Sequence, residues 1–460
     1  MRRESVEIAP TIAGVADIEA VFKAYDIRGR TDTGELDAEL ARWVGAAFAA
    51  VVDDSPIAVG RDCRLSSPSL TAAVTEGITS YGADVLDIGE VATDVVYYVS
   101  GARSVPGVMV TASHNPGEYN GIKLCRAGAV PVGSESGLDD IKKLVLEGGP
   151  EQRGGGAVSV LDPLPGFVDH LFSIVDASAI GPLRVVVDGG NGMAGAVVPR
   201  VFARIPAELI GLYLEPDGTF PNHPADPLQP ENLVDLSAAI EAERPDLGVA
   251  FDGDADRAFF VDDRGVPLSG SATTALVARW FLERHPGASI VHNLITSRAV
   301  PEIVEEAGGV AIRTRVGHSY IKKVMADTDA VFGGEHSGHY YFRDNYRADS
   351  GMLAMLVLMR LMTESGRSLS DLRTDVERYA ASGEINLAVT DHVEALTAVA
   401  SAFADHGIDH VDGLTVDLGD SWFNLRPSNT EPFLRLNVEA PDSAGVDSLV
   451  RRVRGIVVSS

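Results

Sequence analysis

One short segment of the sequence offers a nucleophile beside an acid or base group. Thr111-Ala-Ser-His-Asn-Pro-Gly117 follows an apolar run and presents Ser113, with His114 next to it and Lys123 a little further along. Every residue type in this cluster also favours turns, so an ordinary turn at the end of a strand is the alternative. The segment lacks the Gly-x-Ser-x-Gly pattern of many hydrolases, which disfavours that class.

A second segment, Asp252-Gly-Asp-Ala-Asp-Arg257, spaces three carboxylates two residues apart. Asp252, Asp254 and Asp256 can surround one hard cation with oxygen ligands. An EF-hand loop is excluded, because Arg257 stands where that loop needs glycine. A solvated acidic turn is the alternative, but three crowded carboxylates repel one another without a cation. We therefore expect a metal site, with Arg257 marking an anion that shares it.

Two further loops carry groups that recognise sugars and phosphates. Gly333-Gly-Glu-His-Ser-Gly-His339 places Glu335 and Ser337 where they can hydrogen-bond vicinal hydroxyls, although a tight turn after an edge strand is the alternative. Arg426-Pro-Ser-Asn-Thr430 offers a guanidinium, hydroxyls and backbone N–H groups that suit a phosphate dianion. An ordinary hairpin turn explains this second loop equally well.

Short apolar runs alternate with helical patterns and must position these segments. Leu36 to Val52 has a helical apolar spacing. Strands are predicted at 56–60, 83–89, 107–111, 183–188, 247–251, 258–261, 289–293 and 311–315. Strands separated by helices indicate βαβ units and mixed or parallel sheets. The last 80 or so residues instead have strands at 424–426 and 433–438 before a closing helix, which is an α+β pattern.

The fold class expected is therefore α/β, with four modules. A Gly-rich break at 147–156 marks the first boundary region. The expected modules are an α/β domain with the serine loop, an α/β domain with the metal loop, an α/β domain with the sugar loop, and a smaller α+β domain with the phosphate loop. Their expected bounds are 1–160, 161–265, 266–374 and 375–460.

Composition excludes several classes of protein. The 460 residues include 38 basic and 66 acidic side chains, a net charge of −28, which argues against binding nucleic acid or an anionic membrane. An anionic substrate then needs a local cluster of Arg and Lys side chains.

No apolar stretch reaches the length of a membrane span, about 18 residues. The start of the sequence lacks a signal peptide's apolar core. Cys63 and Cys125 are too few for a disulfide framework, so we expect a soluble, cytoplasmic protein.

In this combination and order, the segments resemble the alpha-D-phosphohexomutases, and most closely the bacterial phosphomannomutase/phosphoglucomutase branch. The resemblance covers essentially the whole chain, and Thr-Ala-Ser-His-Asn-Pro together with Asp-Gly-Asp-Ala-Asp-Arg is highly specific. It implies a heart-shaped molecule of four domains around one cleft, of which the fourth is smaller and mobile.

The resemblance also implies roles for individual residues. Ser113 would be the phosphoserine, and Asp252, Asp254 and Asp256 would hold one Mg²⁺ together with a phosphoserine oxygen. Lys123 would be the general base or acid. The sugar contacts would be Glu335, Ser337, His339 and His318. The phosphate that does not react would be held by Arg426, Ser428, Asn429 and Thr430. Supporting contacts would come from Arg257, His114, Tyr25 and Arg28.

The implied reaction is the interconversion of hexose 6-phosphate and hexose 1-phosphate through a hexose 1,6-bisphosphate. Mannose ranks first as the sugar. Glucose is expected alongside, because a site that contacts only the 3- and 4-hydroxyls cannot distinguish two sugars that differ at carbon 2. Three departures from the dual-specificity pattern are His336 in place of Met, the absence of Lys from 293–298, and Val316 before Gly-His. Phosphoglucosamine mutase is the first alternative, although Asn429 is typical of the mannose/glucose branch.

Two other classes remain open. A metal-dependent sugar phosphatase would use the same serine, and a catalytically silent sugar-phosphate-binding protein would need none of the reactive groups. The expected partners are phosphosugars, and the chain is expected to be a monomer or a homodimer.

Overall fold

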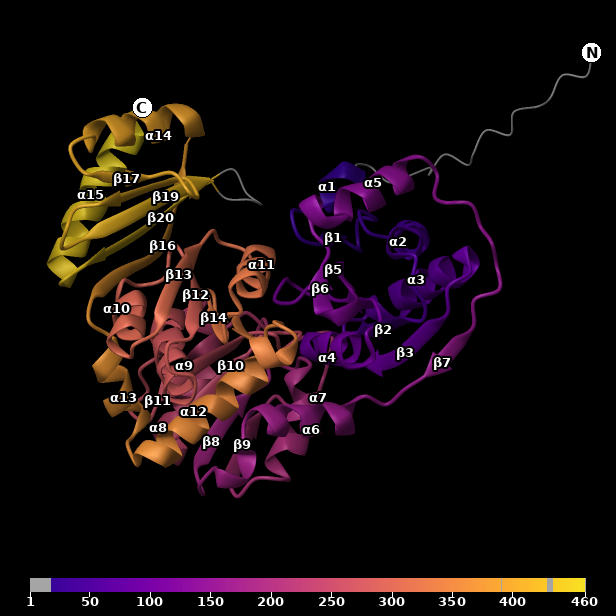
Figure 1. Ribbon diagram of the computed structural model, residues 1–460, viewed down its shortest axis with the longest axis horizontal. Coiled ribbons are helices and arrows are strands. Elements are labelled where there is room, and N and C mark those ends of the chain that lie inside the picture. Colours follow the sequence, from indigo (N-terminus) through magenta and orange to yellow (C-terminus); the bar gives the residue numbers. More distant parts are fainter. Residues whose placement is uncertain (1–17, 390, 428–432, 460) are drawn as a thin grey trace, which may run out of the picture. The chain divides into compact units, whose positions relative to one another are not determined.

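The computed structural model describes residues 18–389, 391–427 and 433–459, and the chain forms two compact units. The first unit contains residues 1–258 and 344–356, and the second contains residues 259–343 and 357–460. The chain passes between them in strand β11 (Ala258–Asp262), between Arg343 and Asp344, and in helix α12 (Gly351–Ser365). Figure 1 labels both of these elements.

The first unit begins with a mixed sheet in the order β1-β5-β4-β2-β3-β7, with β6 paired to β5. Its strands are β1 (Ile27–Arg30), β2 (Ile57–Arg61), β3 (Val85–Glu90), β4 (Gly107–Val110), β5 (Tyr119–Arg126), β6 (Val130–Pro131) and β7 (Val158–Val160). The central strand β2 is parallel to both β3 and β4, whereas β5 is antiparallel to β4 and β1. Strand β4 therefore delivers the serine loop at its carboxyl end.

The helices of this sheet are α1 (Ile18–Val21), α2 (Ala38–Val52), α3 (Ser67–Tyr81), α4 (Thr93–Arg103) and α5 (Leu138–Leu146). The predicted helix at 36–52 is α2, which begins two residues later because the Asp37 side chain caps it by accepting from Leu40 N. Helices α2 and α3 cross closely. A Cβ on Gly45 would lie 2.3 Å from the Val74 oxygen, and one on Gly77 would lie 2.0 Å from the Arg42 oxygen. Glycine is therefore needed at both positions of this crossing.

A parallel sheet in the order β10-β8-β9 completes the first unit. Its strands are β8 (Arg184–Asp188), β9 (Glu208–Leu212) and β10 (Leu247–Phe251), and its helices are α6 (Leu164–Ile174), α7 (Ala194–Phe202) and α8 (Val234–Glu243). Strands β8 and β10 are apolar on both faces, which is typical of a sheet covered by helices. The acidic loop follows β10 directly, at the carboxyl end of the parallel strands.

The second unit contains a mixed sheet in the order β13-β12-β14-β15. The strands are β12 (Ser289–Asn293), β13 (Val310–Thr314), β14 (Phe332–Gly334) and β15 (Tyr340–Phe342), and the helices are α9 (Gly270–Arg284), α10 (Ala299–Glu306), α11 (His318–Thr328) and α13 (Leu369–Val376). Strands β14 and β15 pair antiparallel, so the segment 335–339 is the turn between them.

An antiparallel sheet in the order β16-β20-β19-β18-β17 ends the chain. Its strands are β16 (Ala380–Ala388), β17 (Gly407–Asp409), β18 (Leu414–Asp417), β19 (Trp422–Pro427) and β20 (Phe433–Ala440). Helices α14 (His392–Ala402) and α15 (Ser443–Ser459) pack on it with a separate apolar core (Figure 1). The prediction of three α/β modules and a smaller α+β module is confirmed. In the described part of the chain, no helix combines the length and the apolar character that crossing a membrane requires.

Candidate active site

Ser113 is held by its backbone and its side chain in the loop after β4. Its φ angle is 52°, a left-handed conformation that costs a non-glycine residue on the order of 1 kcal/mol. The Ser113 N–H donates to Thr111 Oγ1 at 2.9 Å, and Ser113 Oγ donates to Asp252 Oδ2 at 2.7 Å. A Cβ on Gly253 would lie 2.4 Å from the Ser113 oxygen, so only glycine allows the two loops to approach this closely. The predicted nucleophile and the predicted metal loop thus lie side by side.

The three aspartates form one buried cluster. Asp252, Asp254 and Asp256 each offer a carboxylate oxygen, and these atoms lie within 4.8 Å of one another. The three side chains are almost fully buried, and Asp254 Oδ1 accepts no hydrogen bond within the described residues. A buried carboxylate oxygen without a donor is costly unless a cation compensates it. The residues present therefore fit a hard divalent cation.

Lys123 and Arg257 supply the positive charge around this cluster. Lys123 Nζ lies 2.7 Å from Asp254 Oδ2 and 2.6 Å from Asp256 Oδ2. Arg257 Nε donates to Asp252 Oδ2 at 2.9 Å. These two side chains therefore compensate part of the repulsion among the carboxylates, which a metal was expected to relieve alone.

The pKa values reflect this pairing. Burial favours the neutral amine, but Asp254 and Asp256 raise the pKa of Lys123 well above its usual range. Burial likewise opposes ionisation of Asp254, yet Lys123 holds the pKa of Asp254 below its usual range. In the state described, Lys123 is thus an ammonium group and a proton donor.

The predicted supporting residues of the first unit have different surroundings. His114 Nδ1 lies 3.3 Å from Ser113 Oγ, and burial, aided by Arg257 and Arg28, lowers the pKa of His114 well below its usual range. Arg28 donates to the Ala112 oxygen at 3.1 Å and to the Asn115 side chain, so it contacts the serine loop. Tyr25 lies half-buried in the segment before β1.

Glu335 in the second unit is a buried carboxylate with three donors. It is 3% exposed and directly follows β14. Its Oε1 accepts from Asn293 Nδ2 and from Gly317 N, both at 3.2 Å, and its Oε2 accepts from the Tyr341 hydroxyl at 2.8 Å. This arrangement fixes the carboxylate orientation, as reading a hydroxyl pattern requires.

The neighbouring predicted sugar contacts lie on the same turn or next to it. The Glu335 N–H donates to the His339 oxygen at 3.0 Å, which closes the turn that holds Ser337. Gly338 has φ +87°, and a Cβ there would lie 2.7 Å from the Phe259 ring, so this turn needs glycine. His318 is the first residue of α11 and follows Gly317, which donates to Glu335.

The structure describes only part of the predicted phosphate loop. Arg426 lies in β19, is 3% exposed and donates through Nη2 to Glu384 Oε2 at 3.1 Å. Its buried Nε donates to no group within the described ranges. A buried guanidinium with a spare donor fits an anion. The three other predicted phosphate ligands, Ser428, Asn429 and Thr430, lie outside the described residues.

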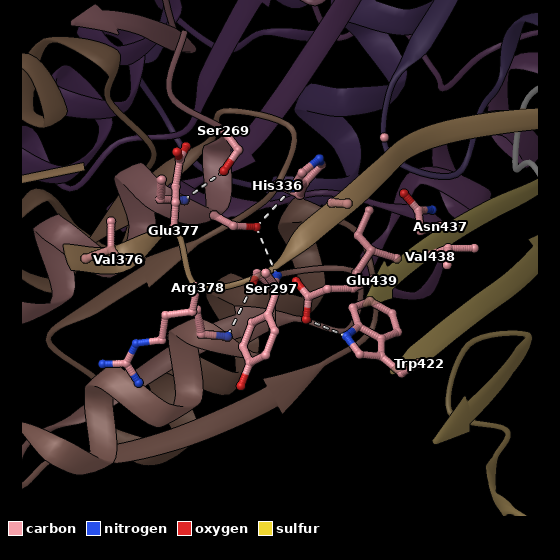
Figure 2. Close-up of a pocket in the computed structure, with 17 residues that line it drawn as sticks. Ser269, Ser297, His336, Val376, Glu377, Arg378, Trp422, Asn437, Val438 and Glu439 are labelled. Carbon is pink, nitrogen blue, oxygen red and sulfur yellow. Dashed lines mark hydrogen bonds between the residues drawn. The ribbon is translucent and has the colours of Figure 1, made fainter. Parts of the chain in front are cut away.

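A pocket of about 250 Å³ lies in the second unit and is lined partly by the sugar turn (Figure 2). His336 lines it and bonds Ser271 Oγ through Nδ1 at 3.0 Å. Glu439 lines it too, and accepts from Trp422 Nε1 at 2.7 Å and from Arg298 N at 3.0 Å. His336 therefore lines this pocket, and its partner Ser271 differs from the partners of its neighbour Glu335.

Several residues that hold these groups could not be recognised from the sequence. Thr93 Oγ1 donates to Asp254 Oδ2 at 2.5 Å, and Asn293 and Tyr341 hold Glu335. Arg64, fully buried, binds the serine loop. The sequence holds one indication of Arg64, because Gly60-Arg-Asp-Cys-Arg64 places charged residues at the end of a buried strand.

Comparison with known proteins gives one consistent result. Residues 19–150, 165–265, 269–379 and 384–456 match, in this order, the α/β/α domains I, II and III and the C-terminal domain of phosphoglucomutase/phosphomannomutase. The chain is 41% identical to phosphohexose mutases of Xanthomonas campestris pv. campestris, over 92% of this chain and 96% of that protein. It is 40% identical to a phosphomannomutase of Salmonella montevideo, over 91% of this chain and 94% of that one.

A solved structure agrees with the sequence relatives. The crystal structure of a phosphoglucomutase/phosphomannomutase family protein from Burkholderia thailandensis superimposes with a TM-score of 0.87 at 32% identity. The match covers 94% of this chain and 96% of that chain.

Proposed function

The chain belongs to the phosphoglucomutase/phosphomannomutase family, and on that premise we propose that it interconverts hexose 1-phosphate and hexose 6-phosphate. Mannose phosphate is the first substrate and glucose phosphate the second. The reaction uses a phosphoserine at Ser113 and passes through a hexose 1,6-bisphosphate, which also serves to prime the enzyme.

The observation that carries the proposal is the contact of Ser113 Oγ with the aspartate cluster at 2.7 Å. In the first half-reaction the bond between phosphorus and Ser113 Oγ breaks, and a bond forms between phosphorus and a sugar hydroxyl oxygen. The hydroxyl proton ends on Ser113 Oγ, which is the protonated state described here. The second half-reaction reverses these bonds at the other end of the bisphosphate.

Phosphoryl transfer depends mainly on positioning and on neutralising charge. Arg257 supplies a fixed positive charge beside Asp252. Asp252, Asp254 and Asp256 would hold Mg²⁺, one ion per chain, and when bound this ion neutralises charge on the transferring group. We assign the relay of this proton to Lys123. Its ammonium group gives a proton to the departing oxygen, which is Ser113 Oγ in the first half-reaction and the sugar oxygen in the second, and it regains a proton from the attacking hydroxyl each time.

The second unit contributes the groups that recognise the sugar phosphate. We assign Glu335, Ser337, His339 and His318 to the sugar and Arg426 to the phosphate that does not react, with Ser428, Asn429 and Thr430 completing that site. The three donors on Glu335 support its assignment, because a carboxylate in a fixed orientation distinguishes hydroxyl positions. A site that contacts only the 3- and 4-hydroxyls makes no contact with the hydroxyl at carbon 2, where mannose and glucose differ. This accounts for dual activity on the two sugars.

The two free cysteines, Cys63 and Cys125, are consistent with a cytoplasmic enzyme, and we place it there.

Phosphorus NMR on the purified 460-residue chain tests the proposal. The sample contains mannose 1-phosphate, Mg²⁺ and a trace of glucose 1,6-bisphosphate. Growth of the mannose 6-phosphate signal without inorganic phosphate is the expected result. Inorganic phosphate alone would instead indicate a phosphatase. Conversion of glucosamine 1-phosphate but not of mannose 1-phosphate would transfer the assignment to a phosphoglucosamine mutase.

A further inference from the structure

Arg64 is a buried guanidinium that binds the backbone of the serine loop. It follows β2 and is 1% exposed. Its terminal nitrogens donate to carbonyl oxygens of Ser113 at 2.7 Å, Asn115 at 2.6 Å, Pro116 at 2.7 Å and Tyr119 at 3.1 Å. One side chain therefore fixes the loop from the serine itself to the first residue of β5.

The charge of Arg64 is balanced away from the serine. Arg64 Nε donates to Asp62 Oδ2 at 3.0 Å, and both side chains are buried. The other oxygen of Asp62 accepts from Arg64 N at 3.0 Å and from Ser67 Oγ at 2.5 Å. Because the guanidinium is paired and its donors are taken up by carbonyl groups, it acts on Ser113 through the loop and not on a phosphate.

A second loop covers the guanidinium. The Phe220 ring centroid lies 5.1 Å from the Arg64 guanidinium carbon, a cation–π contact. A Cβ on Gly218 would lie 2.3 Å from the Cys63 oxygen and 2.7 Å from Arg64 Cα, so the backbone of this loop touches the arginine segment. Arg64 is thus held from the side of the second sheet as well.

These contacts explain how Ser113 keeps a strained backbone. Its N–H is bound by Thr111 Oγ1, its carbonyl oxygen by Arg64 Nη2, and its φ angle is 52°. A left-handed non-glycine residue persists only where its surroundings hold it firmly. Without the arginine fork, the carbonyl side of the serine would lose its partner.

We propose that Arg64 is a positioning residue that holds Ser113 in line for transfer to a sugar and keeps its phosphoryl group from reacting with water. This inference rests on the proposed function. Lysine cannot replace the arginine, because an ammonium is a compact point charge, whereas the planar guanidinium reaches several carbonyl oxygens and Asp62 at once. A loosened loop then slows transfer to the sugar and admits water to the phosphoserine.

The test compares wild type with Arg64→Lys. Each protein is phosphorylated with glucose 1,6-bisphosphate and desalted, and the phosphoserine is followed by intact mass. The isomerisation kcat and KM and the inorganic phosphate released per turnover are then measured. We expect kcat to fall about 30- to 100-fold, since small misplacements of reacting groups cost rates of this order. KM should stay within about threefold, because no substrate contact is removed. Loss of phosphate from Ser113 to water should rise about tenfold.

Arg153→Lys is the matched control. Arg153 also lies over an aromatic ring in the first unit, with its guanidinium carbon 4.5 Å from the Tyr81 centroid. We expect this variant to keep the wild-type kcat and phosphoserine lifetime.

Circular dichroism shows whether each variant folds. If Arg64→Lys does not fold, Asp62→Asn is the second test, because it leaves Arg64 in place and removes the negative charge and one of the two acceptor oxygens beside it. A lower kcat and a shorter phosphoserine lifetime in that variant would support the proposal.

The outcomes separate the two proposals. A folded Arg64→Lys with wild-type kcat and phosphoserine lifetime overturns the role of Arg64 alone. So does a loss of kcat with an unchanged lifetime, since a positioning role in shielding requires both. A wild-type protein that isomerises no hexose phosphate overturns the proposed function instead.

Discussion

The ammonium nitrogen of Lys123 lies 2.6 Å from a carboxylate oxygen of Asp256, inside the cluster that fits a divalent cation. A second oxygen, from Asp254, lies 2.7 Å from the same nitrogen. Lys123 therefore competes electrostatically with a cation for the oxygens that would bind it, while the proposed reaction needs the same side chain to carry a proton.

Lys123→Met should consequently change two quantities in opposite directions. Removing the competing charge should tighten Mg²⁺ binding about tenfold, which corresponds to about 1.4 kcal/mol. Removing the proton carrier should lower kcat about 10²- to 10⁴-fold. Titration calorimetry with Mg²⁺ and the isomerisation assay measure the two effects. Lys143→Met, at an exposed position of α5, serves as the control and should change neither. Weaker Mg²⁺ binding in Lys123→Met would contradict the competition.

Ser113→Ala should leave a folded protein without mutase activity. The variant loses the phosphoryl acceptor and the hydrogen bond to Asp252 Oδ2, while alanine removes only the hydroxyl. We expect kcat to fall about 10³-fold or more, the scale seen when a nucleophile is deleted. Intact mass after incubation with glucose 1,6-bisphosphate should show one added phosphoryl group on the wild type and none on the variant. A phosphoryl group on Ser113→Ala would mean that another residue carries it.

The elements could be predicted because their signals are local. Periodic apolar residues predicted α2, and its start depended only on the cap at Asp37. Continuous apolar runs predicted β8 and β10, which helices cover on both faces. The antiparallel placement of β5 between β4 and β1 was not predicted, because strand order depends on contacts between distant residues.

The site residues also differ in whether local sequence could predict them. Ser113 and Asp252 could be identified because each follows an apolar strand and carries a reactive group. Arg64 was marked only by charges after a buried strand. Its role could not be predicted, because its partners in the serine loop are backbone carbonyl groups 49 to 55 residues away, and backbone groups leave no pattern in a sequence. Tyr341 lies outside every segment that the sequence marked, and only the fold shows that its hydroxyl reaches Glu335.

Tyr341→Phe tests the role of Glu335 in sugar recognition. The substitution removes the hydroxyl that donates to Glu335 Oε2 at 2.8 Å and leaves the ring in place. A buried carboxylate that loses a donor is destabilised by about 1–3 kcal/mol and changes its orientation. We expect KM for mannose 1-phosphate to rise about tenfold, with a smaller change in kcat.

The control for this prediction is Tyr340→Phe. Tyr340 is an equally buried neighbour in β15, and its hydroxyl bonds Thr273 and not Glu335. The Tyr340→Phe variant also loses a buried phenol hydroxyl, so it measures how much KM changes when such a hydroxyl is removed away from Glu335. An equal rise in KM for both variants would show that Tyr341 has no specific effect on the sugar site.

His223 should make the stability of the first unit depend on pH. Its Nε2 lies 3.1 Å from Asp188 Oδ2, and its Nδ1 lies 2.9 Å from the Pro224 oxygen, so both ring nitrogens face acceptors. The hydrogen bond to Asp188 raises the pKa of His223 above its unfolded value of 6.5. The charged pair therefore contributes fully below pH 6.5, and its contribution is lost as the pH rises through the folded-state pKa.

His223→Gln should cost about 1 kcal/mol at pH 6 and progressively less towards pH 8.5. Urea denaturation of wild type and variant at both pH values measures this difference, with His410→Gln, at an exposed position, as the control. A cost that stays constant or grows with pH would show that the pair is not charged in the folded protein.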